Sequence, residues 1–256
     1  MATNGEGRIS VVINTYNARE HLERVLHSVE GFDEVLVCDM ESTDDTVEIA
    51  LRHGCRVVTF PKKDYVCAEP ARTFAIQSAA SEWVLVVDAD ELVTPELRQY
   101  LYRRIGEPGC PALYIPRLNK FLGRYTRSAA YDHQLRFFRR EGTEWPPFVH
   151  TFPTVQGPTE RISPREKGVR LIHLAEESIA DRLEKTNRYT EGELEKRPDR
   201  RFSVWTLFWR PFWRFFRAYF LKLGLRDGRT GLIQAGMEAL YQYVLVAKNI
   251  ERQLRQ

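Results

Sequence analysis

Three carboxylates within four residues form the most chemically suggestive segment of the sequence, Asp88-Ala89-Asp90-Glu91. They directly follow residues 83–87 (WVLVV), an apolar run typical of a buried strand. Side chains two apart on an extended chain point the same way, so Asp88 and Asp90 are expected to converge. Such anions repel unless a cation neutralises them, and hard oxygen ligands suit Mg²⁺ or Mn²⁺, which also bind diphosphates. We therefore predict a divalent metal here. The alternative is a solvated acidic loop that caps the next helix.

The elements that position this segment alternate between strand and helix patterns. Strands are predicted at 8–15, 34–38, 56–60 and 83–87, and helices at 18–29, from 43, at 69–80 and at 94–105. Continuous apolar strands in four such units indicate a parallel sheet with helices on both faces. Ligands of these sheets bind at the carboxyl ends of the strands. Those ends carry polar residues: Asn14-Thr15-Tyr16-Asn17, Asp39 and the carboxylate segment.

The rest of the chain has two different patterns. Residues 111–174 hold short strands, at 112–115, 134–139 and 169–174, among Pro, Gly and aromatic residues, as expected of a mixed-sheet extension facing a substrate. From residue 176 the pattern is helical, with breaks predicted near Pro198, Pro211 and 224–228. We thus expect a domain over 1–175, with halves 1–107 and 108–175, and a helical region over 176–256.

Four motifs in this order, ISVVINTYN, EVLVCDMESTDDT, ARTFAI and WVLVVDADE, resemble family 2 of the glycosyltransferases. Through QLRFFRR, RLIHL and the aromatic C-terminal region, the chain is most similar to bacterial lipopolysaccharide inner-core β-glucosyltransferases. The resemblance implies an α/β fold of the GT-A type, a Rossmann-like, mostly parallel sheet flanked by helices, with a C-terminal amphipathic helical extension. It also implies inverting transfer of a hexose from a nucleotide sugar, a UDP-sugar in our interpretation, to a hydroxyl of a membrane-associated glycan or glycolipid such as lipopolysaccharide core.

The resemblance also assigns roles to individual residues. Tyr16 would contact the base by stacking, Asp39 would accept a hydrogen bond from a uracil-type imide, and Arg72 would approach the base or diphosphate. His173 matches a late histidine that reaches the metal, Mn²⁺ or Mg²⁺; a core histidine is the alternative. The implied donor-binding residues are Thr15, Tyr16, Asn17, Asp39, Arg72 and Asp88, and the implied metal ligands are Asp90 and His173.

The sequence departs from the family pattern at the base that deprotonates the acceptor hydroxyl. Similar enzymes have His-Glu where this chain has Val149-His150-Thr151, and Thr151 cannot serve as that base. His150 and Asp132 are the two candidates, because both can accept a proton. Loss of catalysis, leaving a donor-binding or membrane scaffold protein, is the non-enzymatic alternative. A sugar nucleotidyltransferase would need a Gly-rich loop after the first strand, and residues 14–18 contain no glycine.

The C-terminal region combines positive charge with aromatic residues. The net charge of the 256 residues is +3, yet residues 197–229 hold nine Lys/Arg against two Asp. Residues 202–220 contain ten aromatics, and Arg210, Arg214 and Arg217 recur at helical spacing. This composition suits the headgroup layer of an anionic membrane, so we predict that residues 200–229 bind the inner-membrane surface. Self-association into a homo-oligomer through the C-terminal helices is the alternative. No element resembles a nucleic-acid-binding fold.

Location and redox state follow from what the sequence does not contain. Residues 1–8 have no apolar core of a signal peptide, and no stretch approaches 20 apolar residues, so we expect neither a leader nor a membrane span. Cys38, Cys55, Cys67 and Cys110 have no metal-ligand or redox spacing and are expected to be small core residues. The predicted location is the cytoplasm, peripheral on the inner face of the cell membrane.

Overall fold

The computed structural model describes residues 7–65, 68–125, 132–147, 151–163, 165–195 and 201–255. Two compact units divide the chain, Met1–Leu118 with Asp132–Leu174, and Asn119–Tyr131 with Ala175–Gln256. Residues 119–125 lie in the second unit, whereas the sequence predicts residues 108–175 as one acceptor-binding half. The reason is local, since Gly123 N donates to Glu176 and the Arg182 guanidinium lies 4.5 Å from the Phe121 ring centroid.

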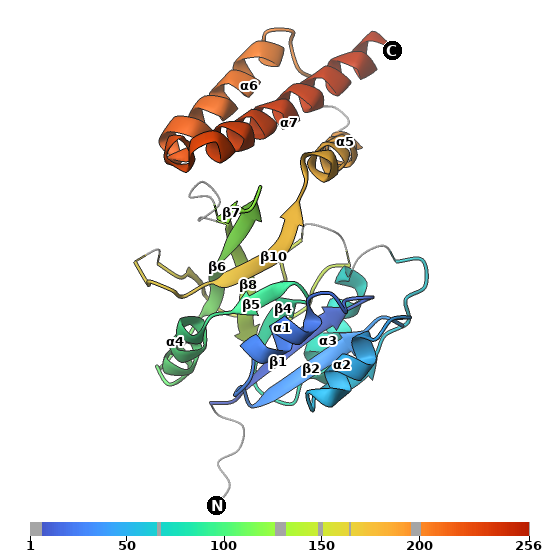
Figure 1. Cartoon of the computed structure of the whole chain (residues 1–256), viewed down its shortest axis with the longest axis vertical. Helices are drawn as coiled ribbons and strands as arrows, with labels where there is room; N and C mark the ends of the chain where they lie inside the picture. Colours follow the sequence, from blue (N-terminus) through green and yellow to red (C-terminus); the bar gives the residue numbers. More distant parts are fainter. Residues whose placement is uncertain are drawn as a thin grey trace, which may run out of the picture. The chain divides into compact units, whose positions relative to one another are not determined.

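The first unit is built on a mixed sheet whose N-terminal strands are parallel (Figure 1). These strands are β1 (Ile9–Thr15), β2 (Glu34–Asp39), β3 (Arg56–Thr59) and β4 (Trp83–Asp88), in the order β3-β2-β1-β4. The sheet continues through β8 (Asp132–Arg139), β6 (Ala112–Phe121), β10 (Leu171–Glu177) and β5 (Glu91–Val93). Short strands β7 (Arg124–Tyr125) and β9 (Thr159–Arg161) pair with β6. The α/β class expected from the sequence is confirmed.

Helices cover both faces of the parallel part, as the continuous apolar strands predicted. Helices α1 (Leu22–Ser28), α2 (Thr46–Arg52) and α4 (Pro95–Ile105) share one core with the inward side chains Val11, Ile13 and Leu85. Helix α3 (Glu69–Ser78) packs against Val12, Leu36 and Val86 on the opposite face. Each aliphatic side chain buried in this way contributes about 1.5–3 kcal/mol, so the strand ends are held on a rigid frame.

Local sequence predicts the start of helix α4 correctly but not the end of strand β6. Helix α4 begins at Pro95 as predicted, because Thr94 Oγ1 accepts a hydrogen bond from Leu97 N at 3.3 Å. Strand β6, in contrast, continues past residue 115 through Pro116, which lies opposite His133 of β8. Proline lacks a ladder donor and therefore usually ends a strand, but here pairing with β8 carries the strand on to Phe121.

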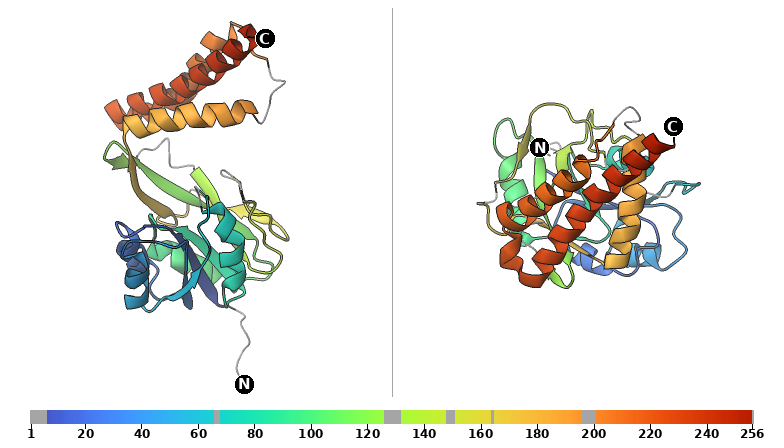
Figure 2. Two further views of the ribbon diagram at one scale, coloured as in Figure 1. Left: turned by 90° about the vertical axis from the view of Figure 1, so that its right-hand side faces the viewer. Right: turned by 90° about the horizontal axis from the view of Figure 1, so that it is seen from above.

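The second unit consists mainly of helices (Figures 1 and 2). They are α5 (Ile179–Glu195), α6 (Thr206–Phe216), a π-helical turn η2 (Arg217–Leu221), a 3₁₀ turn η3 (Gly224–Asp227) and α7 (Gly228–Leu254). Helices α6 and α7 lie side by side, and Leu194, Phe202 and Leu245 join α5 to them. The break predicted near Pro211 is wrong, because α6 runs through it. Among the described residues, no helix combines the length and apolarity that crossing a bilayer requires.

Candidate active site

A cavity of about 490 Å³ opens at the carboxyl ends of the parallel strands in the first unit. Strand pairing brings its parts together, since Asn14 of β1 lies between Cys38 of β2 and Asp88 of β4. Of the site residues predicted from the sequence, the cavity is lined by Thr15, Tyr16, Asn17, Arg72, Asp88, Asp90 and His173. The edge of the sheet predicted to bind a ligand is therefore hollowed as expected.

Asp39 lies behind the wall of this cavity and organises it. Its carboxylate is buried and accepts from Thr15 Oγ1 at 2.9 Å, from Ser42 N at 2.8 Å and from Ser42 Oγ at 2.6 Å. Asn17, at φ +49°, accepts from Thr43 N at 2.8 Å and so ties the end of β1 to the same turn. These bonds hold the two loops that would enclose a nucleotide base.

Tyr16 offers a flat aromatic surface at the mouth of the cavity. Its side chain is 48% exposed, and Lys62 Nζ lies 4.8 Å from the ring centroid. Lys62 also lines the cavity. A ring held this way can stack on a planar base, and the ammonium can meet a phosphate or ribose oxygen.

Asp88 is fixed between two arginines from different elements. Arg72 Nη2 of α3 lies 2.7 Å from Asp88 Oδ1, and Arg136 Nη2 of β8 donates to Oδ2. Burial alone would raise the pKa of Asp88, but Arg136 and Arg72 hold that pKa well below its usual range. The carboxylate is thus ionised near neutral pH and held by two guanidiniums, and it in turn orients Arg72 at the cavity wall.

The ion-pair network extends beneath the cavity to Asp132. Glu91 is fully buried, and its Oε1 lies 3.2 Å from Arg117 Nη1 and 3.7 Å from Arg136 Nη2. Arg117 Nη2 reaches Asp132 Oδ2 at 2.7 Å. Burial and then the Asp88 carboxylate raise the pKa of Glu91 against the opposing charges of Arg136 and Arg117. Six charged side chains, from Arg72 to Asp132, are therefore connected by ion pairs at and under the site.

Several buried polar atoms near the cavity have no hydrogen-bond partner among the described residues. Both side-chain polar atoms of Asn14, which is 6% exposed, are of this kind, as are Nε and Nη1 of Arg72. Trp145 packs beneath both arginines, with guanidinium carbons 4.5 Å (Arg72) and 5.5 Å (Arg136) from its ring centroid. Buried groups without partners are costly, so donors and acceptors at a cavity wall indicate where a polar ligand binds.

Asp90 and His173 meet at the cavity although 83 positions separate them in the sequence. Antiparallel pairing places His173 of β10 opposite Glu91 of β5, and its Nε2 lies 3.2 Å from Asp90 Oδ2. Burial lowers the pKa of His173, but the hydrogen bond and charge of Asp90 outweigh burial and raise it. An imidazole and a carboxylate at this separation also match a shared divalent cation.

Of the two candidate bases, the structure describes only Asp132. His150 lies outside the described residues. Asp132 accepts from Arg117 Nε at 3.1 Å and from Gln134 Nε2 at 2.8 Å, and it is not among the described residues that line the cavity. Thr151 Oγ1 donates to Pro146 O at 3.1 Å. The assignment of the base therefore stays a prediction.

Reasoning from sequence missed several site residues. Arg136 and Arg117 complete the charge network, while Lys62 and Glu69 line the cavity. One signal was present, since Arg136 interrupts the short apolar run 135–138 (LRFF) and arginine is buried almost only when paired. Lys62 follows β3 and Glu69 begins α3, and no local sequence pattern places either side chain at the cavity.

Comparison with known proteins decides the family. The model of "Glycosyl transferase family 2" matches residues 10–176. The chain belongs to glycosyltransferase family 2. An uncharacterised glycosyltransferase of Rickettsia typhi is 27% identical over 97% of this chain and 88% of its own length. One of Rickettsia conorii is 42% identical over 92 residues, which are 36% of this chain and 32% of that protein.

Solved structures support the fold of this family 2 enzyme. The mannosyltransferase PcManGT of Pyrobaculum calidifontis, in complex with GDP-Man and Mn²⁺, superposes with a TM-score of 0.55 at 16% identity, over 95% of this chain and 87% of its own. S. aureus TarS 1-349, in complex with UDP, gives 0.51 at 16% identity, over 97% and 91%. The expected GT-A fold is confirmed, and the family match makes the protein a glycosyltransferase.

Proposed function

We propose that the protein transfers a hexose from a UDP-sugar to a hydroxyl of a membrane-associated glycan, with inversion and with a divalent metal. The observation that carries this proposal is the convergence of Asp88, Asp90, Arg72 and His173 on one cavity at the strand ends. The UDP held by TarS and the GDP-Man and Mn²⁺ held by PcManGT, both proteins of the same fold, support a nucleotide-sugar donor and a metal.

The donor would bind along the wall formed by β1, β2 and α3. Tyr16 stacks on the uracil, and Asp39, whose carboxylate keeps acceptor capacity beyond Thr15 and Ser42, takes the imide N–H. Arg72 has Nε and Nη1 free of partners among the described residues and donates them to the diphosphate. Asp88 accepts from the ribose.

The metal site consists of Asp90 and His173. Adjacent ligands of an octahedral ion with bonds of about 2.1 Å are about 3 Å apart, close to the 3.2 Å between Asp90 Oδ2 and His173 Nε2. The carboxylate and imidazole fit Mn²⁺ better than Mg²⁺, because Mn²⁺ accepts nitrogen more readily. A bound metal supplies positive charge that stabilises the departing diphosphate.

Inverting transfer requires a group that takes the proton of the acceptor hydroxyl as the hydroxyl attacks the anomeric carbon. Asp132 and His150 are the proposed candidates. For Asp132 to act, its carboxylate must turn from Arg117 toward the acceptor, because the ion pair with that guanidinium occupies it in this structure. If neither acts, the cavity is that of a donor-binding scaffold protein, which is the alternative function.

The second unit supports a membrane-bound acceptor, such as the lipopolysaccharide core. Helix α6 has no buried residue, and Trp205 before it is 83% exposed. Among the described residues of 201–229, the large exposed apolar side chains are Val204, Trp205, Phe208, Trp209, Phe212, Trp213, Phe220, Leu221, Leu223 and Leu225. Arginines accompany them, although Arg214 pairs with Glu238 at 2.8 Å. Aromatic rings beside cations suit the surface of an anionic bilayer, so we place the enzyme on the cytoplasmic face of the membrane.

Calorimetry with UDP and a panel of UDP-sugars, with and without Mn²⁺, tests the donor site. Metal-dependent binding is expected for the wild type and for Glu141→Ala, which removes an exposed carboxylate elsewhere. It should be lost in Asp90→Ala. Absence of nucleotide binding in every condition would overturn the proposal. Slow hydrolysis of the bound donor would separate an active enzyme from the scaffold alternative.

A further inference from the structure

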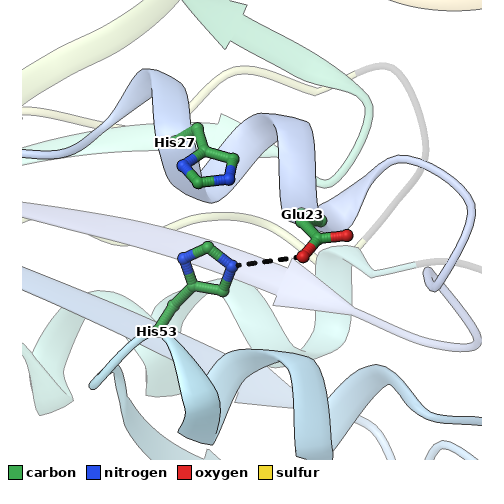
Figure 3. Close-up of side chains that lie close together, drawn as sticks. All are labelled: Glu23, His27 and His53. Carbon is green, nitrogen blue, oxygen red and sulfur yellow. Dashed lines mark ion pairs between the residues drawn. The ribbon is translucent and has the colours of Figure 1, made fainter.

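A second group of metal-ligating side chains lies away from the donor cavity. Glu23 and His27 of α1 and His53 at the end of α2 each offer a ligand atom, and these atoms lie within 4.8 Å of one another (Figure 3). None of the three is among the described residues that line the cavity. We propose that this cluster binds a zinc-class transition-metal ion that cross-links α1 to α2.

The backbone already places the three ligands. Glu23 and His27 are four residues apart, so both project from the same face of α1. Leu22, Val25 and Leu26 bury the opposite side of that helix in the core, and Ile49 and Ala50 do the same for α2. Both helices are thus fixed to the sheet, and only side-chain rotations are needed to close the site.

The separations leave room for an ion between the three side chains. His53 Nε2 lies 3.8 Å from Glu23 Oε1, too far for a hydrogen bond, and the centroids of the two imidazole rings are 4.8 Å apart, edge to face. Ligand atoms around tetrahedral zinc are about 3.4 Å apart, given bonds of about 2.1 Å. Two neutral imidazoles, one carboxylate and a water make an open zinc coordination sphere.

Glu30 prepares His27 for this role. Its Oε1 lies 2.6 Å from His27 Nδ1. Because an ionised carboxylate only accepts, Nδ1 carries the proton, and Nε2 keeps the lone pair that a metal requires. A carboxylate behind a ligating histidine is the usual outer partner in zinc sites, and it raises ligand basicity. The ligand class is therefore zinc or a similar nitrogen-preferring ion, in contrast to the Mn²⁺ or Mg²⁺ of the donor site.

Zinc titration against a chromophoric chelator tests the inference. All variants are made in full-length protein that also carries Asp90→Ala. This background substitution removes a proposed metal ligand of the donor site, so the zinc that is measured binds at the second cluster. Adding His27→Gln and His53→Gln should abolish one equivalent of bound zinc, whereas Arg24→Gln, on an exposed position of the same helix, should retain it. Glu30→Gln should weaken binding about 10-fold. Zinc should also raise the Tm of the background and the Arg24 variant only.

Two results would overturn the inference. One is an equal zinc stoichiometry and affinity with and without the two histidines. The other is zinc binding that shifts no Tm. Circular dichroism of the metal-free variants checks that they fold, and Glu23→Gln alone provides a milder variant with the same expected loss of affinity. Failure of either kind leaves the donor site untouched, because nucleotide binding is measured separately.

Discussion

Arg136 Nη2, on β8, donates to Oδ2 of Asp88, the carboxylate that ends β4. This bond joins the last parallel strand to the first antiparallel strand at the floor of the donor cavity. Arg136 is 4% exposed and also faces the fully buried Glu91, so one guanidinium is shared by a carboxylate at the cavity and a buried carboxylate beneath it. The donor site therefore depends on a residue that is not among the described residues lining its cavity.

Arg136→Ala should destabilise the fold strongly. Removal of Arg136 leaves Asp88 with Arg72 alone and Glu91 with Arg117 alone, so the cost is at most the about 3–5 kcal/mol of an uncompensated buried charge. Arg139→Ala on the same strand is the control, since its side chain is 55% exposed and it pairs with Glu82, a surface contribution of about 1 kcal/mol or less. Urea denaturation measures both. Equal midpoints for the two variants would show that the network contributes little to stability.

Asn14→Ala should separate binding from stability. Both polar atoms of Asn14 are buried without partners among the described residues. In the ligand-free protein their lost hydration therefore lowers the free energy of unfolding, with no hydrogen bond to compensate. We expect a change in the free energy of unfolding within about 1 kcal/mol, because that relief offsets lost packing. The Kd for UDP-sugar should rise about 5- to 30-fold, through loss of one or two hydrogen bonds.

Calorimetry and urea denaturation of Asn14→Ala give the two numbers. A large loss of stability with unchanged affinity would assign Asn14 to the core rather than to the ligand. Ser10→Ala is the matched control, because Ser10 is buried on the same strand but bonds to Glu34 and Ser81. That variant should lose stability and keep its affinity.

Periodicity and strand-end chemistry were enough to predict the parallel half of the sheet and its ligand edge. The apolar runs ending at Asp39 and Asp88 specify both strand and site, because burial and polarity change at one residue. Antiparallel pairing was harder to foresee. The approach of His173 to Asp90 depends on the register of β10 with β5, and resemblance rather than pattern suggested it.

Tertiary pairing also explains what the sequence did not reveal. Arg117 and Asp132 belong to neighbouring strands with an irregular register, so their contact cannot be read from either segment alone. The continuation of α6 through Pro211 has a similar origin, because packing along α7 outweighs one missing hydrogen bond. Glu69, at the start of α3, lines the cavity because α3 packs on the sheet with its first turn at the strand ends, a placement that only the tertiary structure determines.

Thiol reactivity provides a test of the two cores. Burial and then the charge of Asp39 raise the pKa of Cys38 to about 12, and burial raises that of Cys55 to about 11. At pH 8 the thiolate fraction of Cys38 is then roughly 10⁻⁴. Peptide mapping after iodoacetamide should find both residues unlabelled in the native protein and labelled in guanidinium. Native labelling of Cys38 at the rate of free cysteine would contradict its burial beside Asp39.

The exposed aromatic face of α6 should bind anionic bilayers. Trp205 and Trp209 would each bury most of a ring in the headgroup layer, so Trp205→Glu with Trp209→Glu should weaken binding to phosphatidylglycerol vesicles at least about 10-fold. Leu51→Glu, on an exposed apolar position of α2, should not. Binding should also fall in high salt and on neutral vesicles, because the basic residues act through screened charge. The face would instead be assigned to self-association by two results together. Both variants would bind vesicles equally, and analytical ultracentrifugation would show a dimer that only the Trp variant loses.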